Sequence, residues 1–397
     1  GEDSDTSSTS LISSYISTLG AEFKFFKNDL LNSIVLELSK ILNLMKKILI
    51  FSLLIILLLA IVGYFSLSNQ HVQNFLLKSL FESRMQALFA ESESDSSDEL
   101  EIFFCGSGSP LSMMPEGAQC MAFVIGSDIY VIDNGENSFA KISNNYPPQN
   151  IKAVFITHAH SDHIGDLDEL NLRRWVSGAE TPLEVYGSSE IINVAEGINL
   201  AYQNDENYRV DHHGVEFVPP ENRPMIPIVH IPTNSPQLIF EDENLKVESF
   251  LVDHHPVKEA LGFRLFFGNK KIIISGDTEI TDNVFSLVNG ADILIHDGMI
   301  KDHVRLLEKV AKENNVYRAE VAFHDILDYH ADVIDIKRNL ENKDLGLLII
   351  NHLVPAKNPI GIRYMEDLFS DVSYDFLLAR DNDKIIVSKN SDEIIIN

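Results

Sequence analysis

Six residues, HAHSDH at positions 158–163, constrain the fold more than any other stretch of the chain. They follow an apolar run at 151–156 that predicts a buried strand. In an extended segment His158 and His160 project from the same face, and Asp162 and His163 follow as the chain turns toward a helix. Imidazole nitrogens and carboxylate oxygens are the ligands of catalytic zinc and similar divalent ions. The segment therefore predicts a metal site at the carboxyl end of a strand.

Three later apolar runs end in the same kinds of residue. Asp253-His254-His255 follows the run at 247–251, Asp277 follows 271–274, and Asn351-His352 follows 347–350. In a sheet covered by helices, the loops after the strands meet at one edge and carry the functional groups. We expect these later residues to complete the metal site.

Short apolar runs and helical patterns alternate through the same region. This alternation predicts a mixed α/β fold in which sheets lie between helices. A hairpin turn is expected at Gly268-Asn269-Lys270. Strands are predicted at 129–132, 153–156, 261–267, 271–274, 293–295 and 347–350, and helices at 167–176, 190–202, 302–313 and 331–340.

The motifs HAHSDH, VDHHPVKEALGF, IIISGDT, and YH followed by IINHLVP resemble those of the metallo-β-lactamase superfamily, in the same order. The likeness covers residues 104–355. Within the superfamily, the chain is most similar to a membrane-anchored hydrolase branch related to arylsulfatases and ribonuclease Z. The resemblance implies an αββα sandwich, in agreement with the predicted strands and helices.

The resemblance also implies two divalent ions, zinc with manganese or iron as alternatives. One ion would have three histidine ligands, the other two histidines and an aspartate, and a further aspartate would bridge them. In that order the implied ligands are His158, His160 and His254, then Asp162, His163 and His352, and the bridging Asp277.

Two residues are expected to take part in the reaction itself. A hydroxide that bridges two metal ions is a nucleophile at neutral pH, because coordination lowers its pKa. Asp162 would orient that hydroxide or take its proton. His330, in Asp328-Tyr329-His330, resembles the family histidine that donates a proton or stabilises an oxyanion.

Two positions depart from the family pattern. His255 stands where the family usually has Gly, so His254 and His255 are both candidates for that ligand. Ala331-Asp332 follows His330 where relatives tend to have Thr-Ser. His296 and His324 are each followed by an aspartate. Each could hydrogen-bond to a metal ligand or simply pack in the fold, and the sequence is compatible with both.

Residues 48–67 contain no charged side chain, and their length suffices to cross a bilayer as a helix. Lys46 and Lys47 precede them, which predicts an uncleaved signal anchor with the rest of the chain outside the cytoplasm. Met45 before these lysines resembles a natural start, so residues 1–44 are interpreted as an upstream extension with a polar tail. Leucines and isoleucines at 30–42 predict a helix that either lies at the interface or continues the anchor. We expect a stalk and acidic linker at 68–99 and a hydrolase domain at 100–397.

The composition limits the kinds of partner and of cysteine site that the chain can have. The formal net charge is -28, which disfavours nucleic acid because affinity for phosphate backbones comes largely from Lys and Arg. Two cysteines, Cys105 and Cys120, exclude a disulfide scaffold or a four-cysteine zinc site. Outside the cytoplasm they could pair with each other, and as buried thiols they need no special role. The oligomeric state is open, and a homodimer is compatible with the sequence.

The predicted function is hydrolysis of a small ester by a membrane-anchored enzyme with two metal ions. An aryl sulfate or a phosphodiester is the leading substrate class. The alternatives are a ribonuclease Z-like endonuclease for tRNA 3′ ends and a hydrolase of lactones or β-lactams. A binding protein on the same scaffold would have lost ligands, and all seven ligand positions are present.

Overall fold

The computed structural model describes residues 36–64, 68–89, 98–110 and 116–397, without the side chains of 84–89. The chain divides into two compact units, Gly1–Gln86 and Ala87–Asn397, and each is described by itself. The predicted polar tail before residue 36, most of the predicted acidic linker and the last three residues of the predicted span lie outside the described residues.

Two helices begin among the described residues of the N-terminal unit. The helix Leu36–Tyr64 has 29 residues and contains an 18-residue stretch with a mean hydropathy of 2.6, so by length and composition it could cross a membrane. It begins before the predicted span, and residues 36–42 therefore continue the apolar helix. The second helix, α2, covers Gln70–Phe89.

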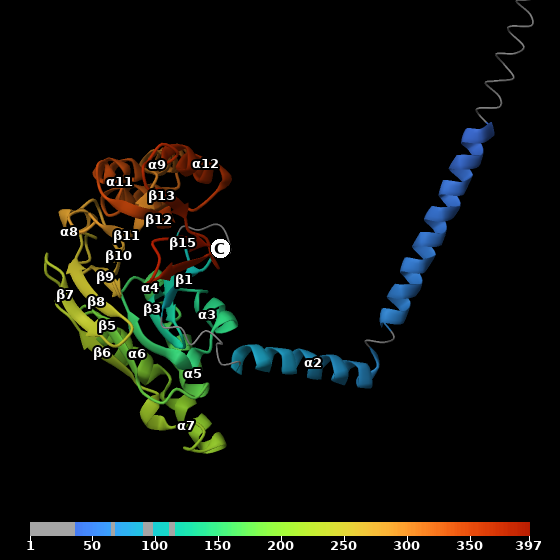
Figure 1. Ribbon diagram of the computed structural model, residues 1–397, viewed down its shortest axis with the longest axis horizontal. Helices are drawn as coiled ribbons and strands as arrows, with labels where there is room; N and C mark the ends of the chain where they lie inside the picture. Colours follow the sequence, from blue (N-terminus) through green and yellow to red (C-terminus); the bar gives the residue numbers. More distant parts are fainter. Residues whose placement is uncertain (1–35, 65–67, 90–97, 111–115) are drawn as a thin grey trace, which may run out of the picture. The chain divides into compact units, whose positions relative to one another are not determined.

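Two mixed sheets face each other in the C-terminal unit (Figure 1). The eight-stranded sheet has the order β15-β14-β1-β2-β3-β4-β5-β6, and the seven-stranded sheet has the order β13-β12-β11-β10-β9-β8-β7. The first sheet contains β1 (Glu99–Gly106), β2 (Cys120–Ile125), β3 (Asp128–Asn134), β4 (Ile151–Phe155), β5 (Leu183–Gly187), β6 (Met225–Val229), β14 (Lys384–Ser388) and β15 (Ile394–Ile396). The second contains β7 (Gln237–Glu241), β8 (Lys246–Leu251), β9 (Leu261–Phe267), β10 (Lys270–Ile274), β11 (Ala291–Met299), β12 (Leu345–Val354) and β13 (Asp375–Leu378).

Successive side chains of a strand point to opposite faces of its sheet, and in this unit both faces are buried. On β1, Leu100, Ile102 and Phe104 belong to the core between the sheets. Phe103 and Cys105 point the other way, into the core beneath the helices. Strands that are covered on both faces are largely apolar, which is why runs such as 129–132 and 153–156 predicted strands.

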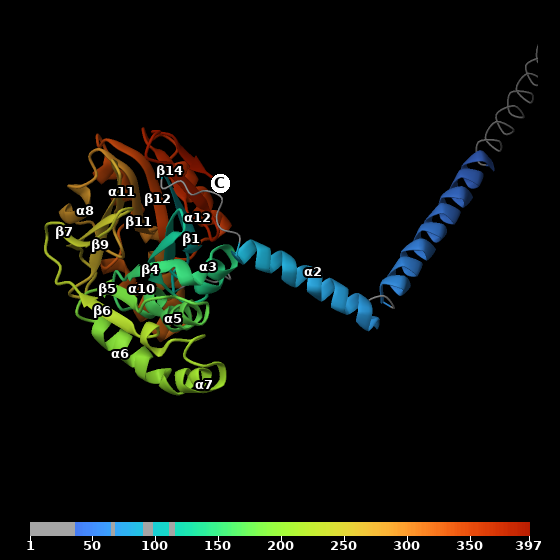
Figure 2. The same ribbon diagram turned by 60° about the horizontal axis from the view of Figure 1, so that its bottom comes forward.

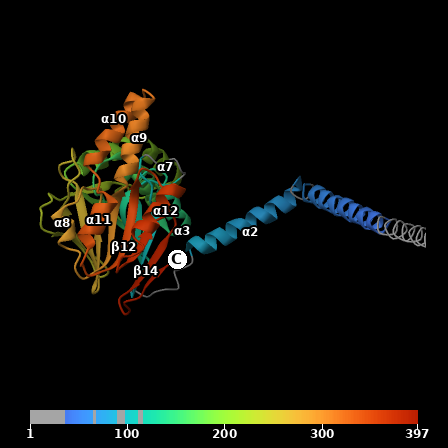
Figure 3. The same cartoon turned by 90° about the horizontal axis from the view of Figure 1, so that it is seen from above.

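Helices cover the outer face of each sheet, as Figure 2 shows from a second direction. Helices α3, α5 and α6 pack on the first sheet, and α8, α11 and α12 pack on the second. Helices α9 and α10 lie side by side at one end (Figure 3). The helix bounds are α3 (Phe139–Asn145), α4 (Ser161–Ile164), α5 (Leu167–Val176), α6 (Ile191–Ala201), α7 (Gln203–His213), α8 (Asp282–Phe285), α9 (Lys301–Glu313), α10 (Tyr317–Asp325), α11 (Val333–Leu340) and α12 (Pro359–Leu368). The predicted αββα sandwich is confirmed.

Parallel pairing brings the predicted ligand segments together. In the first sheet β3 and β4 run parallel, and in the second β10, β11 and β12 run parallel. The carboxyl ends of neighbouring parallel strands meet at one edge of a sheet. The chain after β4, after β10 and at the end of β12 therefore reaches a common site.

Candidate metal centre

Three histidines form the first group of candidate ligands. Their ligating nitrogens all lie within 4.8 Å of one another: His158, His160 and His254. The closest pair, His158 Nε2 and His160 Nδ1, is 2.8 Å apart, and His254 Nε2 is 3.3 Å from the same His160 atom. Burial lowers the pKa of all three imidazoles, so they are neutral at pH 7. Neutral imidazole is the form that binds a metal ion.

Two histidines and two aspartates form the second group: Asp162, His163, Asp277 and His352. His352 Nε2 lies 3.0 Å from Asp162 Oδ2 and 3.4 Å from Asp277 Oδ2. His163 Nε2 lies 3.3 Å from Asp277 Oδ2. Gly276 has φ +63°, a conformation that side chains rarely adopt, and it turns the chain after β10 so that Asp277 enters the group.

The residues of this group fit a divalent cation. His163 is fully buried, yet its Nε2 has no hydrogen-bond partner among the described atoms, and it faces two carboxylates. Burial alone would raise the pKa of Asp277, but His352 and His163 hold it well below its usual range, so Asp277 is ionised. Two buried carboxylates and converging ring nitrogens are the donor set that a zinc-like ion takes.

Asp277 connects the two groups. Besides its place in the second group, it lies within 4.8 Å of ligand atoms of His254 and His330. Asp277 therefore lies close to a member of each group.

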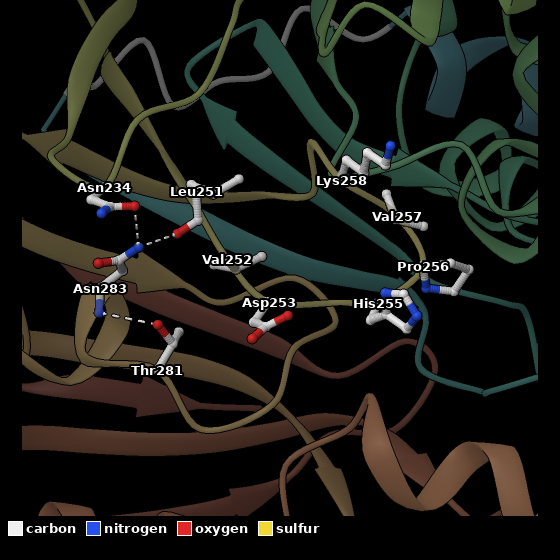
Figure 4. Close-up of a pocket in the computed structure, with 10 residues that line it drawn as sticks. All are labelled: Asn234, Leu251, Val252, Asp253, His255, Pro256, Val257, Lys258, Thr281 and Asn283. Carbon is white, nitrogen blue, oxygen red and sulfur yellow. Dashed lines mark hydrogen bonds between the residues drawn. The ribbon is translucent and has the colours of Figure 1, made fainter.

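His254 and His255 have different environments. His254 is 1% exposed and its Nδ1 lies 2.9 Å from the carbonyl oxygen of Tyr329, which fixes the ring. His255 is exposed and lines a cavity of about 500 Å³ together with Asp253 and Lys258 (Figure 4). Of the two candidates, only His254 lies in the histidine group.

His330 is oriented by a neighbouring carboxylate. Its Nδ1 lies 2.9 Å from Asp297 Oδ2 on β11, and the pair is buried. Burial alone would raise the pKa of Asp297, but hydrogen bonds with His296 and His330 lower it, so Asp297 is ionised. Asp332 caps α11 by accepting from the Ile334 N–H, so the unusual Ala-Asp pair after His330 still starts a helix.

A comparison with protein families decides the identity. The family model described as anti-Pycsar protein Apyc1 matches residues 100–308, more than half of the chain. The chain belongs to the anti-Pycsar Apyc1 family.

Ribonuclease Z enzymes are similar to this Apyc1-family chain. Ribonuclease Z of Mycobacterium bovis (strain BCG / Pasteur 1173P2) is 28% identical over 265 residues, 66% of this chain and 88% of the relative. That of Mycolicibacterium gilvum (strain PYR-GCK) is 26% identical over 264 residues, 66% of this chain and 86% of the relative.

Two solved structures share the fold. The metallo-β-lactamase fold protein YhfI of Bacillus subtilis has a TM-score of 0.53 at 17% identity, covering 73% of this chain and 100% of its own. The short form of human tRNase Z has a TM-score of 0.50 at 20% identity, covering 72% and 98%. With the fold, the relatives and the His/Asp groups together, the chain is a metal-dependent hydrolase of the metallo-β-lactamase superfamily.

Two supporting residues of this Apyc1-family site were not predicted from the sequence. Asp133, at the end of β3, is buried and accepts hydrogen bonds from the N–H and hydroxyl of Thr157, and it pairs with His163 Nδ1 at 2.8 Å. The signal that revealed the other ligands, a polar residue after an apolar run, also marks Asp133. The Tyr329 carbonyl next to His254 has no such signal, because a backbone group is independent of residue type.

The remaining histidines lie away from the ligand groups. His212 and His213 are the last two residues of α7, which Gly214 caps. His296 is buried and contacts Asp297, so it supports His330, whereas His324 is exposed beside Glu308. His71, His230 and His303 are outside both groups, and none of the three is buried.

Cys105 and Cys120 form a disulfide with 5.1 Å between their Cα atoms. It joins the end of β1 to the start of β2 beneath the loop that contains Gly106-Ser107-Gly108. Such bonds persist in oxidising compartments. Of the two possibilities for these cysteines, a disulfide or two buried thiols, the structure has the disulfide.

Proposed function

We propose that this chain is a phosphodiesterase with two metal ions that hydrolyses a small cyclic nucleotide. The observation that supports it most is the meeting of two ligand groups at Asp277 in a chain of the Apyc1 family, a family of cyclic nucleotide phosphodiesterases. The Apyc1 and ribonuclease Z relatives both favour a phosphodiester over the predicted aryl sulfate, lactone or β-lactam.

Each ligand group would hold one ion. His158, His160 and His254 would hold the first, and Asp277 would be shared. The second would be held by Asp162, His163 and His352. Zinc suits this mixture of nitrogen and oxygen donors, with manganese or iron as alternatives. Bound ions supply Lewis acidity and an activated water at neutral pH.

Side chains around the ions would orient the attacking water and transfer its proton. Asp162 is ionised, because His163 and His352 overcome the effect of burial and lower its pKa to about 2. It can therefore accept a hydrogen bond from the attacking water and orient it. Water adds to phosphorus, the bond from phosphorus to one ribose oxygen breaks, and that oxygen needs a proton.

His330 is the residue that we assign to this last transfer. Asp297 accepts a hydrogen bond from the Nδ1–H. Nε2 then faces the site, where it would take the proton that the attacking water releases and deliver it to the departing oxygen. Asp297 acts only through His330, as a positioning residue.

A tRNA 3′-end endonuclease is the second candidate. The ribonuclease Z relatives favour it, since they align along most of their length. The net charge of -28 opposes it, because tRNA binding requires Lys and Arg against the phosphate backbone.

We also propose that the enzyme is anchored in a membrane with its catalytic unit outside the cytoplasm. The helix Leu36–Tyr64 supports the anchor, and Lys46 and Lys47 within its first half favour a cytoplasmic N-terminus. The disulfide supports an oxidising compartment.

A substrate panel tests the proposal. The full chain in detergent, loaded with zinc, would be given purine and pyrimidine 3′,5′-cyclic mononucleotides, a precursor tRNA, a bis-aryl phosphate, an aryl sulfate and a β-lactam. We expect the cyclic nucleotides to have the highest kcat/KM. Faster cleavage of the precursor tRNA would establish the second candidate instead, and turnover of the sulfate or lactam alone would refute a phosphodiesterase.

A further inference from the structure

The strand that contains His352 is irregular at this residue. Strands β11 and β12 pair in parallel register up to His296 and Ile350, and the register resumes at Gly298 and Leu353. Two residues of β12, Asn351 and His352, therefore stand opposite one residue of β11. An extra residue of this kind is a β-bulge, which re-aims side chains near active sites.

The bulge places His352 in an uncommon backbone conformation. Its φ is +55°, in the left-handed region. A residue with a side chain rarely adopts this conformation, which persists only where the surroundings hold it. Because the conformation directs Nε2 to within 3.0 Å of Asp162 and 3.4 Å of Asp277, whatever holds the bulge also sets this ligand.

A buried hydrogen bond beside His352 is suited to hold it. Asn351 is 1% exposed, and its Nδ2 donates to Gln119 Oε1 at 2.9 Å. Its Oδ1 is buried and has no partner among the described atoms. Gln119 is itself 5% exposed. A buried amide that lost this bond would be left wholly unsatisfied, so the bond disfavours any other position of Asn351.

Gln119 is attached to the other half of the second ligand group. Its carbonyl oxygen accepts from the Gly135 N–H at 2.9 Å, and the preceding Ala118 N–H donates to the Glu136 carbonyl at 2.8 Å. Gly135 in turn lies so close to Asp162 that a Cβ added there would be 1.9 Å from the Asp162 carbonyl oxygen. Gln119 thus connects the segment that abuts Asp162 with the strand of His352.

We propose that Gln119 and Asn351 are positioning residues of the second metal site: their buried hydrogen bond holds the β12 bulge that aims His352 at Asp162 and Asp277. The inference rests on the proposed function, because it concerns one of the two ions. It assigns neither residue to the metal or to the substrate.

Zinc affinity tests this directly. The full chain in detergent would be stripped with a chelator and titrated with zinc against a chromophoric competitor. Gln119→Leu keeps the size of the side chain and removes the acceptor. We expect it to weaken one of two zinc sites by about 10–100-fold, the usual effect of losing a partner behind a ligand, and to leave the other unchanged. Gln119→Glu keeps an acceptor and should restore most of the affinity.

Tyr130→Phe is the matched control. It removes one side-chain hydrogen bond, 2.6 Å to Asp242, elsewhere between the sheets, and should leave both zinc affinities unchanged. The increase in Tm on addition of zinc is a second readout, which a change in packing alone would leave unaltered. With the Leu variant, zinc should raise the Tm less than it does with the wild type. An equal loss of Tm with and without zinc would overturn the positioning role.

The outcomes separate the two proposals. Two zinc ions bound by the wild type, with unchanged affinities in Gln119→Leu, would refute the positioning role and leave the proposed function standing. Fewer than two ions in the wild type would overturn both, because there would be no second site to position. If Gln119→Leu does not fold, Asn351→Ser breaks the same hydrogen bond from the other side and the same expectations apply to it.

Discussion

Replacement of His330 by alanine should separate proton transfer from metal binding. The His330 ring is 7% exposed, and its centre lies 5.4 Å from that of His254 and 5.3 Å from that of His352. It is therefore close enough to both ligand groups to serve as a ligand or as a proton donor. Its hydrogen bond with Asp297 fixes a proton on Nδ1 and orients Nε2, and the metal content of the variant separates the two roles.

The expected loss can be worked out from these contacts. A positioned general acid contributes about 10²–10⁴-fold, which is about 3–5 kcal/mol of activation free energy. The free energy of unfolding should also fall, by about 1.5–3 kcal/mol, because the variant lacks the hydrogen bond to the charged Asp297. His296 remains beside Asp297, which favours the lower end of that range.

Two measurements check this expectation: elemental analysis of the purified variant, and kcat/KM for a cyclic nucleotide and for a nitrophenyl phosphodiester. Metal content should equal that of the wild type. The rate loss should be smaller for the nitrophenyl substrate, whose leaving oxygen needs little protonation. Loss of a metal ion, or an equal rate loss for both substrates, would refute the donor role.

Three further predictions concern the ions and the membrane. Asp277→Ala and His254→Ala should each lose metal together with activity, whereas His255→Ala should keep both ions, as elemental analysis would show. If His255→Ala empties a site and His254→Ala does not, the ligand is His255. In the metal-free protein, burial lowers the pKa of His163 and His352, but the carboxylates of Asp277 and Asp162 outweigh burial and raise the pKa of both imidazoles. Zinc must therefore displace protons from them at neutral pH. It should bind more tightly as the pH rises. Calorimetry in buffers of different ionisation enthalpy measures this release, and an enthalpy independent of buffer would contradict it. Protease added to intact spheroplasts should remove the catalytic unit, and full protection would place that unit inside the cytoplasm.

Much of the fold was predictable because its strands are buried on both faces. Runs such as 261–267 and 271–274 are mostly apolar, with Arg264 and Lys271 as the charged exceptions, and the structure has β9 and β10 at nearly the same bounds. Helix α5 occupies the predicted residues. Helix α7 was not predicted, because it has no buried residue and hence no apolar period to detect.

The candidate site was predictable to the same extent and for a related reason. Its side chains come directly after apolar runs, so residue type and position along the chain were enough to single out Asp277 and His352. Asp133 was missed although it obeys the same rule, since it contacts Thr157 and His163 rather than standing in a recognisable motif.

The sequence by itself determined the kinds of candidate ligand, their order along the chain and most of the strands that precede them, because each depends on a few consecutive residues. Only the tertiary structure decided which residues meet. The choice of His254 over His255 depends on the direction of one turn, and the Asn351–Gln119 hydrogen bond joins residues 232 positions apart. Such contacts are set by the register of β12 on β11 and by the packing of the two sheets, which no local pattern encodes.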